Sequence, residues 1–411
     1  MIEQQLPETI SQTGYLSFRL TVTEPLYNGI GARSMECILA SLPGLAQCRL
    51  ISHTSTINIT FEWESGAGAA RYDRGFMVDL IDLPGPRDYF LQFTWDSHEG
   101  RCDGYFNGIP LRIAGTRFTP WQIAGAATRL VAIPATYRVS NTEVHARFIP
   151  PEEIVRLVPP PLLQRDGSLI GATIPDARMS IHWNTTDEQP IYTVKPGRKT
   201  DLQSWKMEGP GEVSPTPDGW LMRTSSSKPA SAPGHFVYWC PVILPESFIA
   251  EWEFKPLNSK GLAIVFFAAA GPGAVDIFDR HLPARDGIFS QYTQGDLHSY
   301  HITYFANLPL FQTGRPTSNL RKNSGFYLVA QGPVAIRPDA QQFQKLRLVK
   351  CRSHIAFYSG DRPVLDWHDS NPSRFGPAHG AGRIGLRQME GTVGEYRNLN
   401  IRALPHPPPR A

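Results

Sequence analysis

The sequence predicts an all-β protein made of two β-sandwich domains in tandem. The chain holds 35 Gly and 37 Pro among 411 residues, a composition typical of many short strands joined by turns. Apolar and polar residues alternate with a period of two in many segments, whereas the helical period is hard to find. The length is about two to three times that of a typical domain, which favours two domains over one.

Strand-like alternation is clearest in "FIAEWEFK", which predicts one apolar face made of Phe248, Ala250, Trp252 and Phe254. The segments 89–95 and 345–367 show the same alternation. Within the second segment, Gly360 and Asp361 predict a turn between two strands. The segment "EEIVRLV", residues 152–158, fits either a short helix or a strand.

A proline-rich segment, "RLVPPPLLQRDG", divides the chain. Three consecutive prolines cannot donate to a sheet ladder and favour an extended conformation, so we expect a strap between domains here. The predicted organisation is an N-terminal β-sandwich of residues 1–157, a linker and connecting segment of residues 158–194, a C-terminal sandwich of residues 195–404 and a disordered tail of residues 405–411.

The bulk charge excludes several classes of partner. There are 40 Lys and Arg against 37 Asp and Glu, with no basic run, so neither nucleic acid nor an anionic membrane is expected as a partner. No apolar run approaches the roughly 20 residues of a membrane span. The five cysteines are odd in number and lack C-x-x-C spacing, which predicts free thiols and no zinc site.

The N-terminus, "MIEQQLPETISQTGYL", lacks a basic region followed by an apolar one, so no secretory signal is predicted. Together with the few cysteines, this favours a cytoplasmic location. A trimmed mature form of a secreted protein would show the same pattern.

Hydrogen-bonding side chains crowd two predicted strands, "QYTQGDLHSYHITYFANL" and "SNLRKNSGFYLV". Alternation places His301 on one face of the first strand, with Tyr300 and Tyr304 on the other. In the second strand Asn319, Arg321 and Asn323 share a face, whereas Lys322 points the other way and is expected to be solvated. Each polar group buried without a partner costs about 1–3 kcal/mol, so the crowding predicts a wet groove that binds a ligand.

The second half of the chain, from Trp205 to Leu404, contains seven distinctive blocks: "WKMEGPGE", "GHFVYWCPVILPESFIAEWEF", "GLAIVFFAA", "DIFD", "QYTQGDLHSYHITYF", "SNLRKNSGFYLVAQG" and "GRIGLRQM" with "YRNLNI". In order and spacing these blocks resemble the YesU-like family of domains of unknown function. The resemblance implies a concanavalin A-like jelly-roll of two antiparallel sheets and a substrate of the pectin or rhamnogalacturonan type. In the N-terminal half, "YFLQFTWDSHEGRCDGYFNGIPLR" is similar to a hairpin of laminin-G-like and concanavalin-like sandwiches.

The first functional hypothesis is β-elimination on a uronate-containing oligosaccharide. That reaction needs a cation or amide to neutralise the carboxylate of the sugar, with a base and an acid for proton transfer. The candidates for proton transfer are His301, Tyr300 and Tyr304. The candidates for substrate binding are Gln291, Tyr292, Asp296, Asn319, Arg321, Asn323, Trp239 and Trp367. The aromatic rings among them can stack on a sugar.

Three alternatives stay open. Hydrolysis by two carboxylates could use Asp276, Asp279, Asp286 or Asp296, although a D-x-x-D spacing puts its carboxylates on opposite faces of a strand. A non-catalytic carbohydrate-binding protein would use the same groove. An interaction scaffold would have no polar groove at all.

No cofactor is expected. His298 and His301 are three residues apart, and an extended strand separates them, so they do not predict a metal site. A structural calcium held by carboxylates is compatible with the sequence. In the N-terminal half, the charged residues of "WDSHEGRCDGYFNG" predict a solvated hairpin loop, and this domain is expected to bind sugar or pack beside the groove.

Overall fold

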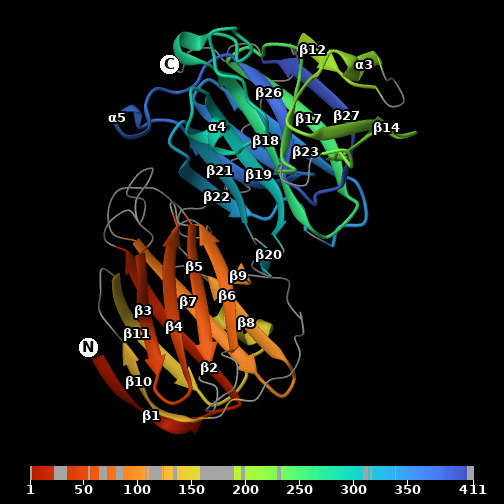
Figure 1. Ribbon diagram of the computed structural model, residues 1–411. Helices are drawn as coiled ribbons and strands as arrows, with labels where there is room; N and C mark the ends of the chain where they lie inside the picture. The colour runs from red at the N-terminus through yellow and green to blue at the C-terminus, as the bar shows by residue number, and fades with distance from the viewer. Residues whose placement is uncertain are drawn as a thin grey trace. The chain divides into compact units, whose positions relative to one another are not determined.

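The chain folds into two compact units of antiparallel β-structure (Figure 1). One unit comprises Met1–Gly171 with Leu310–Pro316, and the other comprises Ala172–Pro309 with Thr317–Ala411. The computed structural model describes residues 2–22, 35–53, 56–63, 72–79, 87–106, 109–110, 123, 125–132, 137–157, 189–195, 200–228, 233–308, 313–314, 317–337 and 339–404.

The N-terminal unit is a β-sandwich. Its six-stranded sheet has the order β1 (Ile2–Ile10), β10 (Ala127–Ala132), β3 (Met35–Leu42), β4 (Ala46–His53), β5 (Thr56–Trp63) and β6 (Tyr72–Asp79). Its five-stranded sheet has the order β11 (Tyr137–His145), β2 (Thr13–Val22), β7 (Arg87–Asp96), β8 (Arg101–Phe106) and β9 (Ile109–Pro110). The short strand β20 (Thr313–Gly314) lies in the segment that groups with this unit.

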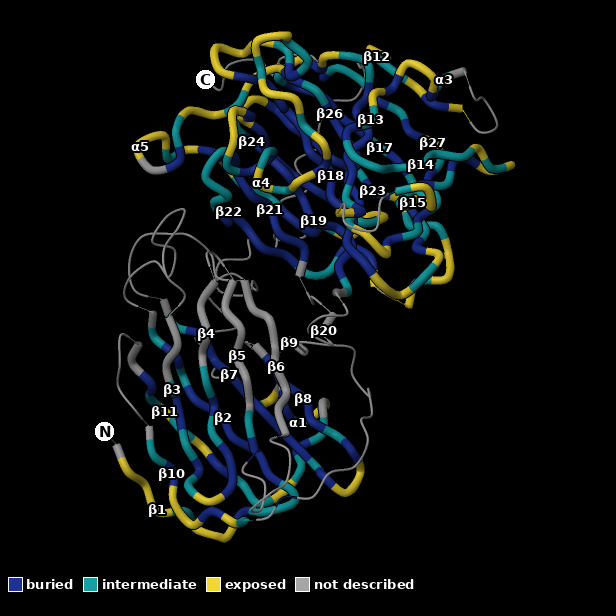
Figure 2. The backbone as a smooth tube through the Cα atoms, viewed as in Figure 1, coloured by how far each residue is buried: buried dark blue, intermediate teal, exposed yellow. Residues whose placement is uncertain are grey.

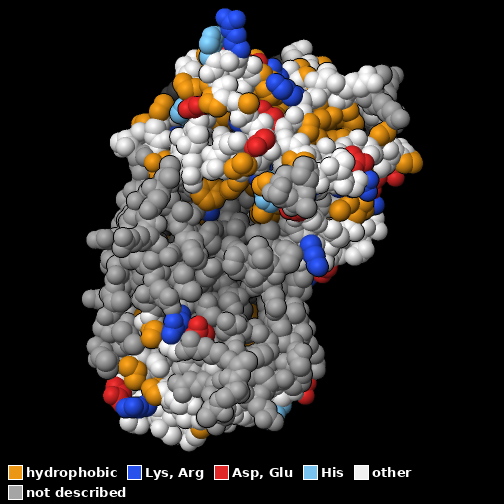
Figure 3. Space-filling model, in the orientation of Figure 1, with side chains coloured by type: hydrophobic (Ala, Val, Ile, Leu, Met, Phe, Trp, Pro, Cys, Tyr) orange, Lys and Arg blue, Asp and Glu red, His pale blue; other side chains and the backbone are white. Residues whose placement is uncertain are grey.

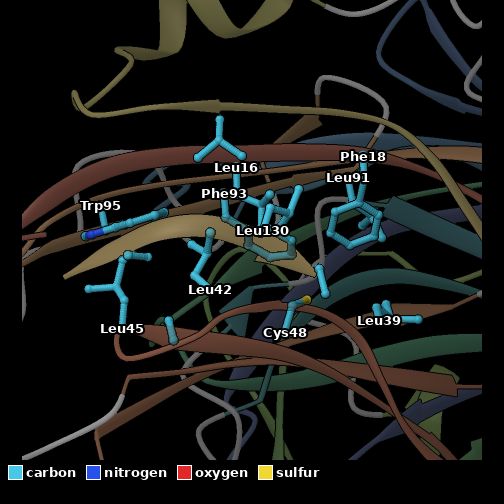
Figure 4. Close-up of a cluster of buried hydrophobic side chains, with 14 of the residues drawn as sticks. Leu16, Phe18, Leu39, Leu42, Leu45, Cys48, Leu91, Phe93, Trp95 and Leu130 are labelled. Atoms are coloured by element: carbon cyan, nitrogen blue, oxygen red, sulfur yellow. The ribbon is translucent and has the colours of Figure 1, made fainter. Parts of the chain in front are cut away.

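Apolar side chains from both sheets form the core of the N-terminal unit (Figure 4). Leu16 and Phe18 of β2 and Phe93 of β7 belong to the same cluster as Leu39 and Leu42 of β3. This interleaving follows from the alternation of side chains along each strand.

Two sequence predictions for this unit can be compared with the structure. The segment read as a helix or a strand forms α1 (Pro151–Ile154) and the 3₁₀ turn η1 (Val155–Leu157). At the predicted hairpin loop, His98 and Glu99 are exposed. Asp103 differs from that prediction, because it lies on β8 with its side chain buried 3.7 Å from Arg101 Nη2.

The C-terminal unit also has two sheets. The first contains β14 (Gly211–Pro215), β15 (Trp220–Thr224), β27 (Gly394–Ala403), β17 (Ser247–Pro256), β23 (Gln344–Cys351), β24 (His354–Ser359) and β25 (Arg362–His368) in that order, and β12 (Gln189–Thr193) pairs with β27. The second contains β13 (Lys206–Glu208), β16 (Phe236–Trp239), β26 (Arg383–Gln388), β18 (Gly261–Ala270), β19 (His298–Leu308), β21 (Thr317–Asn323) and β22 (Tyr327–Pro333) in that order.

The predicted alternation in β17 is confirmed. Phe248, Ala250, Trp252 and Phe254 are all at most 1% exposed. The ring centroid of Trp252 lies 5.8 Å from that of Tyr304 on β19, so this face of β17 packs against the other sheet. The predicted turn at Gly360 is also confirmed, because it joins β24 and β25 with Ser359 opposite Arg362.

Both faces of β18 are buried, as Figure 2 shows for the centre of this unit. One face packs against the first sheet. The other face is covered by residues 271–297, which carry the short helices η2 (Pro272–Ala274) and α4 (Ser290–Thr293). In that segment Ile277 and Tyr292 belong to one apolar cluster with Ile264 and Phe266 of β18. Two further short helices are α3 (Thr200–Gln203) and α5 (Pro372–Phe375).

Some predictions fall outside the described residues. They are the part of the proline-rich linker at 158–188 and the tail at 405–411. Residues 189–193, which we included in the connecting segment, form a strand of the C-terminal unit.

Candidate functional site

The register of β19 and β21 brings the predicted polar residues together. His301 pairs with Arg321, Thr303 with Asn319 and Ser299 with Asn323. Directly opposite residues of an antiparallel pair share a face of the sheet. The imidazole, guanidinium and amide side chains therefore lie on one face, as the alternation predicted.

That face is covered rather than open. His301 is 1% exposed, and its ring centroid lies 5.2 Å from that of Phe266 and 5.8 Å from those of Phe289 and Phe326. The guanidinium of Arg321 lies over the Phe326 ring at 4.0 Å, and its Nη1 donates to the Phe326 carbonyl at 2.9 Å. Aromatic side chains thus occupy the space where the sequence predicted a groove.

The amides in this cluster bond to protein. Asn323 Nδ2 donates to Ser299 Oγ at 3.0 Å and contacts His301 Nδ1 at 3.0 Å. Because an amide nitrogen only donates, His301 Nδ1 accepts this bond and the ring proton sits on Nε2. Gln331 Nε2 donates to Asn319 Oδ1 at 3.2 Å. In this conformation His301, Arg321, Asn319 and Asn323 stabilise the sheet and its covering segment.

The two predicted proton-transfer tyrosines face the core between the sheets, and both are 0% exposed. Tyr300 Oη donates to Asp369 Oδ2 at 2.5 Å, and Tyr304 Oη lies 3.1 Å from Tyr396 Oη. Burial is the main cause that raises the pKa of each phenol. Both hydroxyls bond to other side chains inside the protein in this structure, and their role in proton transfer stays a prediction from the sequence.

Other predicted ligand-binding residues also have structural partners. Trp239 and Tyr292 are both 0% exposed, with ring centroids 6.4 Å apart, and Trp239 Nε1 donates to Glu208 at 2.9 Å. Gln291 Oε1 accepts the N–H of Asp286 at 3.0 Å. These side chains hold the segment that covers β18.

Trp367 is half-buried, with its ring edge against Tyr300 at 6.1 Å. Asp296 is exposed in the turn before β19. Neither residue lies with the polar cluster of His301 and Arg321.

Three of the carboxylates considered for hydrolysis accept hydrogen bonds from the protein. Both oxygens of Asp276 accept from Arg383, at 2.7 and 2.6 Å, and this hydrogen bonding is the main cause that lowers the pKa of Asp276. Asp279 accepts from the N–H and the ring of His281. Asp286 is exposed and accepts from the N–H of Ile288 at 3.4 Å.

Lys322 is buried, contrary to the prediction that it is solvated. Its Nζ lies 2.6 Å from Asp369 Oδ2, and both side chains are 1% exposed. The same Nζ donates to the carbonyls of Gly376 at 2.8 Å and Pro377 at 2.9 Å. The alternation that places Lys322 on the face opposite Arg321 was correct. That face is the inner one, where a carboxylate from the loop after β25 supplies the partner of Lys322 in place of water.

The buried ion pair fixes one wall of a pocket. Tyr300 Oη donates to Asp369 and accepts the N–H of His379 at 2.9 Å. With the two carbonyls held by Lys322, this network anchors residues 375–381 at several points. A loop anchored in this way is largely formed before a ligand arrives.

The pocket has a volume of about 460 Å³. It lies at one end of the second sheet, where β18 ends, β19 begins, β21 turns into β22 and the chain enters β26. Its lining comprises Ala268, Ala270, Gly271, Gly273, Ala274, His298, Ser324, Tyr327, Phe375, Gly376, Pro377, Ala378, His379, Gly380 and Ala381. None of these residues is Asp, Glu, Lys or Arg.

Two imidazoles and two aromatic rings supply the chemistry of this pocket. The ring centroids of His298 and His379 are 5.8 Å apart, and those of Tyr327 and Phe375 are 5.3 Å apart. His379 Nε2 lies 2.8 Å from the carbonyl oxygen of Asn323, so Nε2 carries the proton and Nδ1 can accept a hydrogen bond. Burial lowers the pKa of His379 to about 3, which keeps this imidazole neutral at physiological pH.

The backbone around the pocket adopts costly conformations. Ala268 and Ala274, both in the lining, have φ of 48° and 62°, and Phe326, next to Tyr327, has φ of 58°. An L-residue in the left-handed region costs about 1–2 kcal/mol. Such strain is typical of functional sites, where the surrounding structure holds it in place.

Most residues of this pocket were not predicted from the sequence. Its main wall lies in "NPSRFGPAHGAG", residues 371–382. The available signal was a histidine in a loop of Gly, Pro and Ala, which is an unusual place for a titratable side chain. That signal does not show which strand ends lie beside the loop.

In the described part of the chain, no group of three or more His, Cys, Asp or Glu is placed to hold a metal ion. The helices among those residues are also too short or too polar to span a bilayer. On the face shown in Figure 3, Lys, Arg, Asp and Glu of the C-terminal unit are dispersed rather than gathered in one patch.

The fold and the pocket define a β-sandwich protein with a ligand-sized pocket formed by loops at one end of a sheet. The family model described as "Domain of unknown function (DUF1961)" matches residues 189–401. The chain belongs to this family through its C-terminal unit, which confirms the resemblance noted from the sequence.

The chain is also similar to individual proteins and solved structures. The "Uncharacterized protein YesU" of Bacillus subtilis (strain 168) is 35% identical over 205 residues, which are 49% of this chain and 90% of that protein. A Bacillus subtilis protein of unknown function with a galectin-like fold is similar over 53% of this chain and 100% of its own, with 30% identity and a TM-score of 0.47. Carbohydrate-binding module CBM66 from Bacillus subtilis is similar over 49% of this chain and 97% of its own, with 14% identity and a TM-score of 0.32.

Proposed function

We propose that this protein binds a carbohydrate in the pocket at the end of the second sheet and does not catalyse a reaction on it. The observation that carries the proposal is the lining itself, which places the rings of Tyr327 and Phe375 beside the imidazoles of His298 and His379. Aromatic rings stack on the apolar faces of sugars, and neutral imidazoles exchange hydrogen bonds with hydroxyls. A cavity of about 460 Å³ falls within the usual range for small-molecule sites.

The small residues of the lining support the same ligand class. Gly376 and Gly380 have no heavy atom within 4 Å of the position that a Cβ would occupy. The backbone therefore borders open space there, and its peptide groups can reach the hydroxyls of a sugar. Because the lining has no charged carboxylate, ammonium or guanidinium, recognition depends on stacking and neutral hydrogen bonds.

β-Elimination on a uronate is the second candidate. It is favoured by the neutral imidazole of His379 and the phenol of Tyr327, which are a possible base and acid in one pocket. Against it, no cation lines the pocket to neutralise the carboxylate of a uronate. Hydrolysis by paired carboxylates has no support, because the lining contains neither Asp nor Glu.

A calorimetric titration of the full chain with neutral and uronate-containing oligosaccharides tests the proposal. Recognition predicts saturable binding with no change in the sugar. Elimination predicts the ultraviolet absorbance of an unsaturated uronate, and hydrolysis predicts new reducing ends without that absorbance.

The matched variants are Tyr327→Ala, in the pocket, and Tyr358→Ala, on the other sheet beside Arg347. Weaker binding only in Y327A supports the pocket. Equal binding by both variants contradicts it.

A further inference from the structure

Three arginines lie in or against the segment that covers β18, and two of them hold a carboxylate in the same way. Arg285 donates from Nε and Nη2 to Glu208, at 3.1 and 2.7 Å. Arg383 donates from Nε and Nη2 to Asp276, at 2.7 and 2.6 Å. In both pairs the side edge of the guanidinium meets two oxygens, which is the strong bidentate arrangement.

The third arginine, Arg387 of β26, is 0% exposed and has no carboxylate partner among the described residues. Its Nη1 donates to the carbonyl of Gly287 at 2.9 Å. Its Nε and Nη2, the same edge that the other two arginines use, have no hydrogen-bond partner in the described part of the chain. The guanidinium carbon lies 4.8 Å from the ring centroid of Phe289 and 5.4 Å from that of Tyr292.

Burying a guanidinium in this way is costly. A charge removed from water needs an opposite charge and hydrogen bonds to replace its hydration. Two aromatic faces and one carbonyl supply only part of that compensation. The charge persists, because burial lowers the pKa of Arg387 only to about 10. A buried charge with an unpaired edge needs acceptor atoms, and an anion supplies both the acceptors and the opposite charge.

We propose that the Nε–Nη2 edge of Arg387 binds a small planar anion of the carboxylate class, such as formate or nitrate, beneath Phe289 and Tyr292. The edge matches two oxygens, as the neighbouring pairs with Glu208 and Asp276 show. The anion must be small, because Arg387 is 0% exposed and two rings lie over it. This site is separate from the sugar pocket, whose lining does not include Arg387.

The anion stabilises the covering segment by joining it to the sheet. Gly287, Phe289 and Tyr292 all belong to residues 271–297, and all three contact Arg387 on β26. An anion that binds only the folded state raises its stability in proportion to the logarithm of anion concentration, once that concentration exceeds the dissociation constant.

Thermal unfolding of the full chain in increasing sodium formate is the first test. Ionic strength is held constant with sodium HEPES, whose anion is too bulky to reach Arg387. The wild type should gain a similar increment in Tm for each tenfold increase in formate above the dissociation constant. Arg387→Met should lose this dependence, whereas Arg383→Met, which removes the same charge from the same strand, should keep it.

Equal formate responses in all three proteins, or no response in the wild type, would overturn the proposal. If R387M does not fold, wild-type crystals soaked in sodium formate decide the question, at a resolution that separates formate from water. A formate with its two oxygens facing Nε and Nη2 supports the site. A water at that position in formate-soaked crystals, or side chains that fill it, would contradict it.

Discussion

Lys322 Nζ and Asp369 Oδ2 lie 2.6 Å apart with both side chains 1% exposed, and this buried pair joins the sheet to the loop that forms the pocket. The lysine belongs to β21, and the carboxylate follows β25 by one residue. Since the same ammonium also binds the carbonyls of Gly376 and Pro377, stability and pocket shape depend on one interaction.

Removing one member of this pair should be strongly destabilising. Lys322→Met leaves the carboxylate of Asp369 buried without its cation, at an expected cost of about 3–5 kcal/mol in the free energy of unfolding. Urea denaturation measures it. The control is Arg337→Met, which breaks an exposed pair with Asp339 and should cost less than about 1 kcal/mol. Similar losses in both variants would mean that the buried pair has no special role.

Sugar affinity should depend on the Tyr327 ring. Replacing it with alanine removes one stacking surface from the pocket. An aromatic stacking contact of about 1.4 kcal/mol corresponds to a tenfold weaker dissociation constant. Calorimetry on Y327A should therefore show binding weakened by about tenfold or more, with the unfolding midpoint nearly unchanged. Unchanged affinity would place the sugar elsewhere.

Filling the pocket should abolish binding without unfolding the protein. Ala378 is exposed and lines the pocket, so Ala378→Trp places an indole in the cavity at little cost to the core. We expect no measurable titration heat with a sugar that the wild type binds. Ala378→Ser is the matched control and should bind normally. Retained affinity in A378W would argue against this cavity as the binding site.

The folded protein should lose stability in acidic solution, because His379 binds a proton more readily in the unfolded chain than in the folded one. Its pKa is lowered from 6.5 to about 3 in the folded protein, chiefly by burial. Between those values the unfolded chain binds a proton that the folded chain does not. Stability from this group is therefore present above about pH 6.5 and is lost as pH falls towards 3, by at most about 1.4 kcal/mol per pH unit.

Urea unfolding of the wild type and His379→Gln across this pH range measures the difference. The glutamine amide can still donate to the carbonyl of Asn323 but does not titrate. The wild type should lose more stability than H379Q as pH falls. His281→Gln, at a ring that is 76% exposed, should follow the wild type. Parallel curves for wild type and H379Q would contradict the buried neutral imidazole.

The strands and the polar cluster could be predicted because they depend on local pattern. The period of two in β17 determined which side chains reach the core, and His301 and Arg321 were assigned to faces that the register then brought together. Whether other side chains cover His301 and Arg321 was not predictable from local pattern. Whether that face is open depends on Phe289 and Tyr292, which come from a segment without regular alternation.

The buried network was beyond local pattern for the same reason. Lys322 and Asp369 are 47 residues apart, and the sequence near either residue does not predict that the two pair. The sequence predicted a role in proton transfer for Tyr300 because its phenol hydroxyl is a polar group on a strand. Its hydroxyl instead satisfies Asp369 and the N–H of His379 inside the protein. Long-range pairing of this kind appears only in the folded structure.

A crystal structure of the full chain with an oligosaccharide that binds in calorimetry tests the central claim most directly. We expect a sugar ring against Tyr327 or Phe375, with its hydroxyls within hydrogen-bonding distance of His298 or His379. Sugar bound at any other surface, with this pocket holding only solvent, would contradict the account.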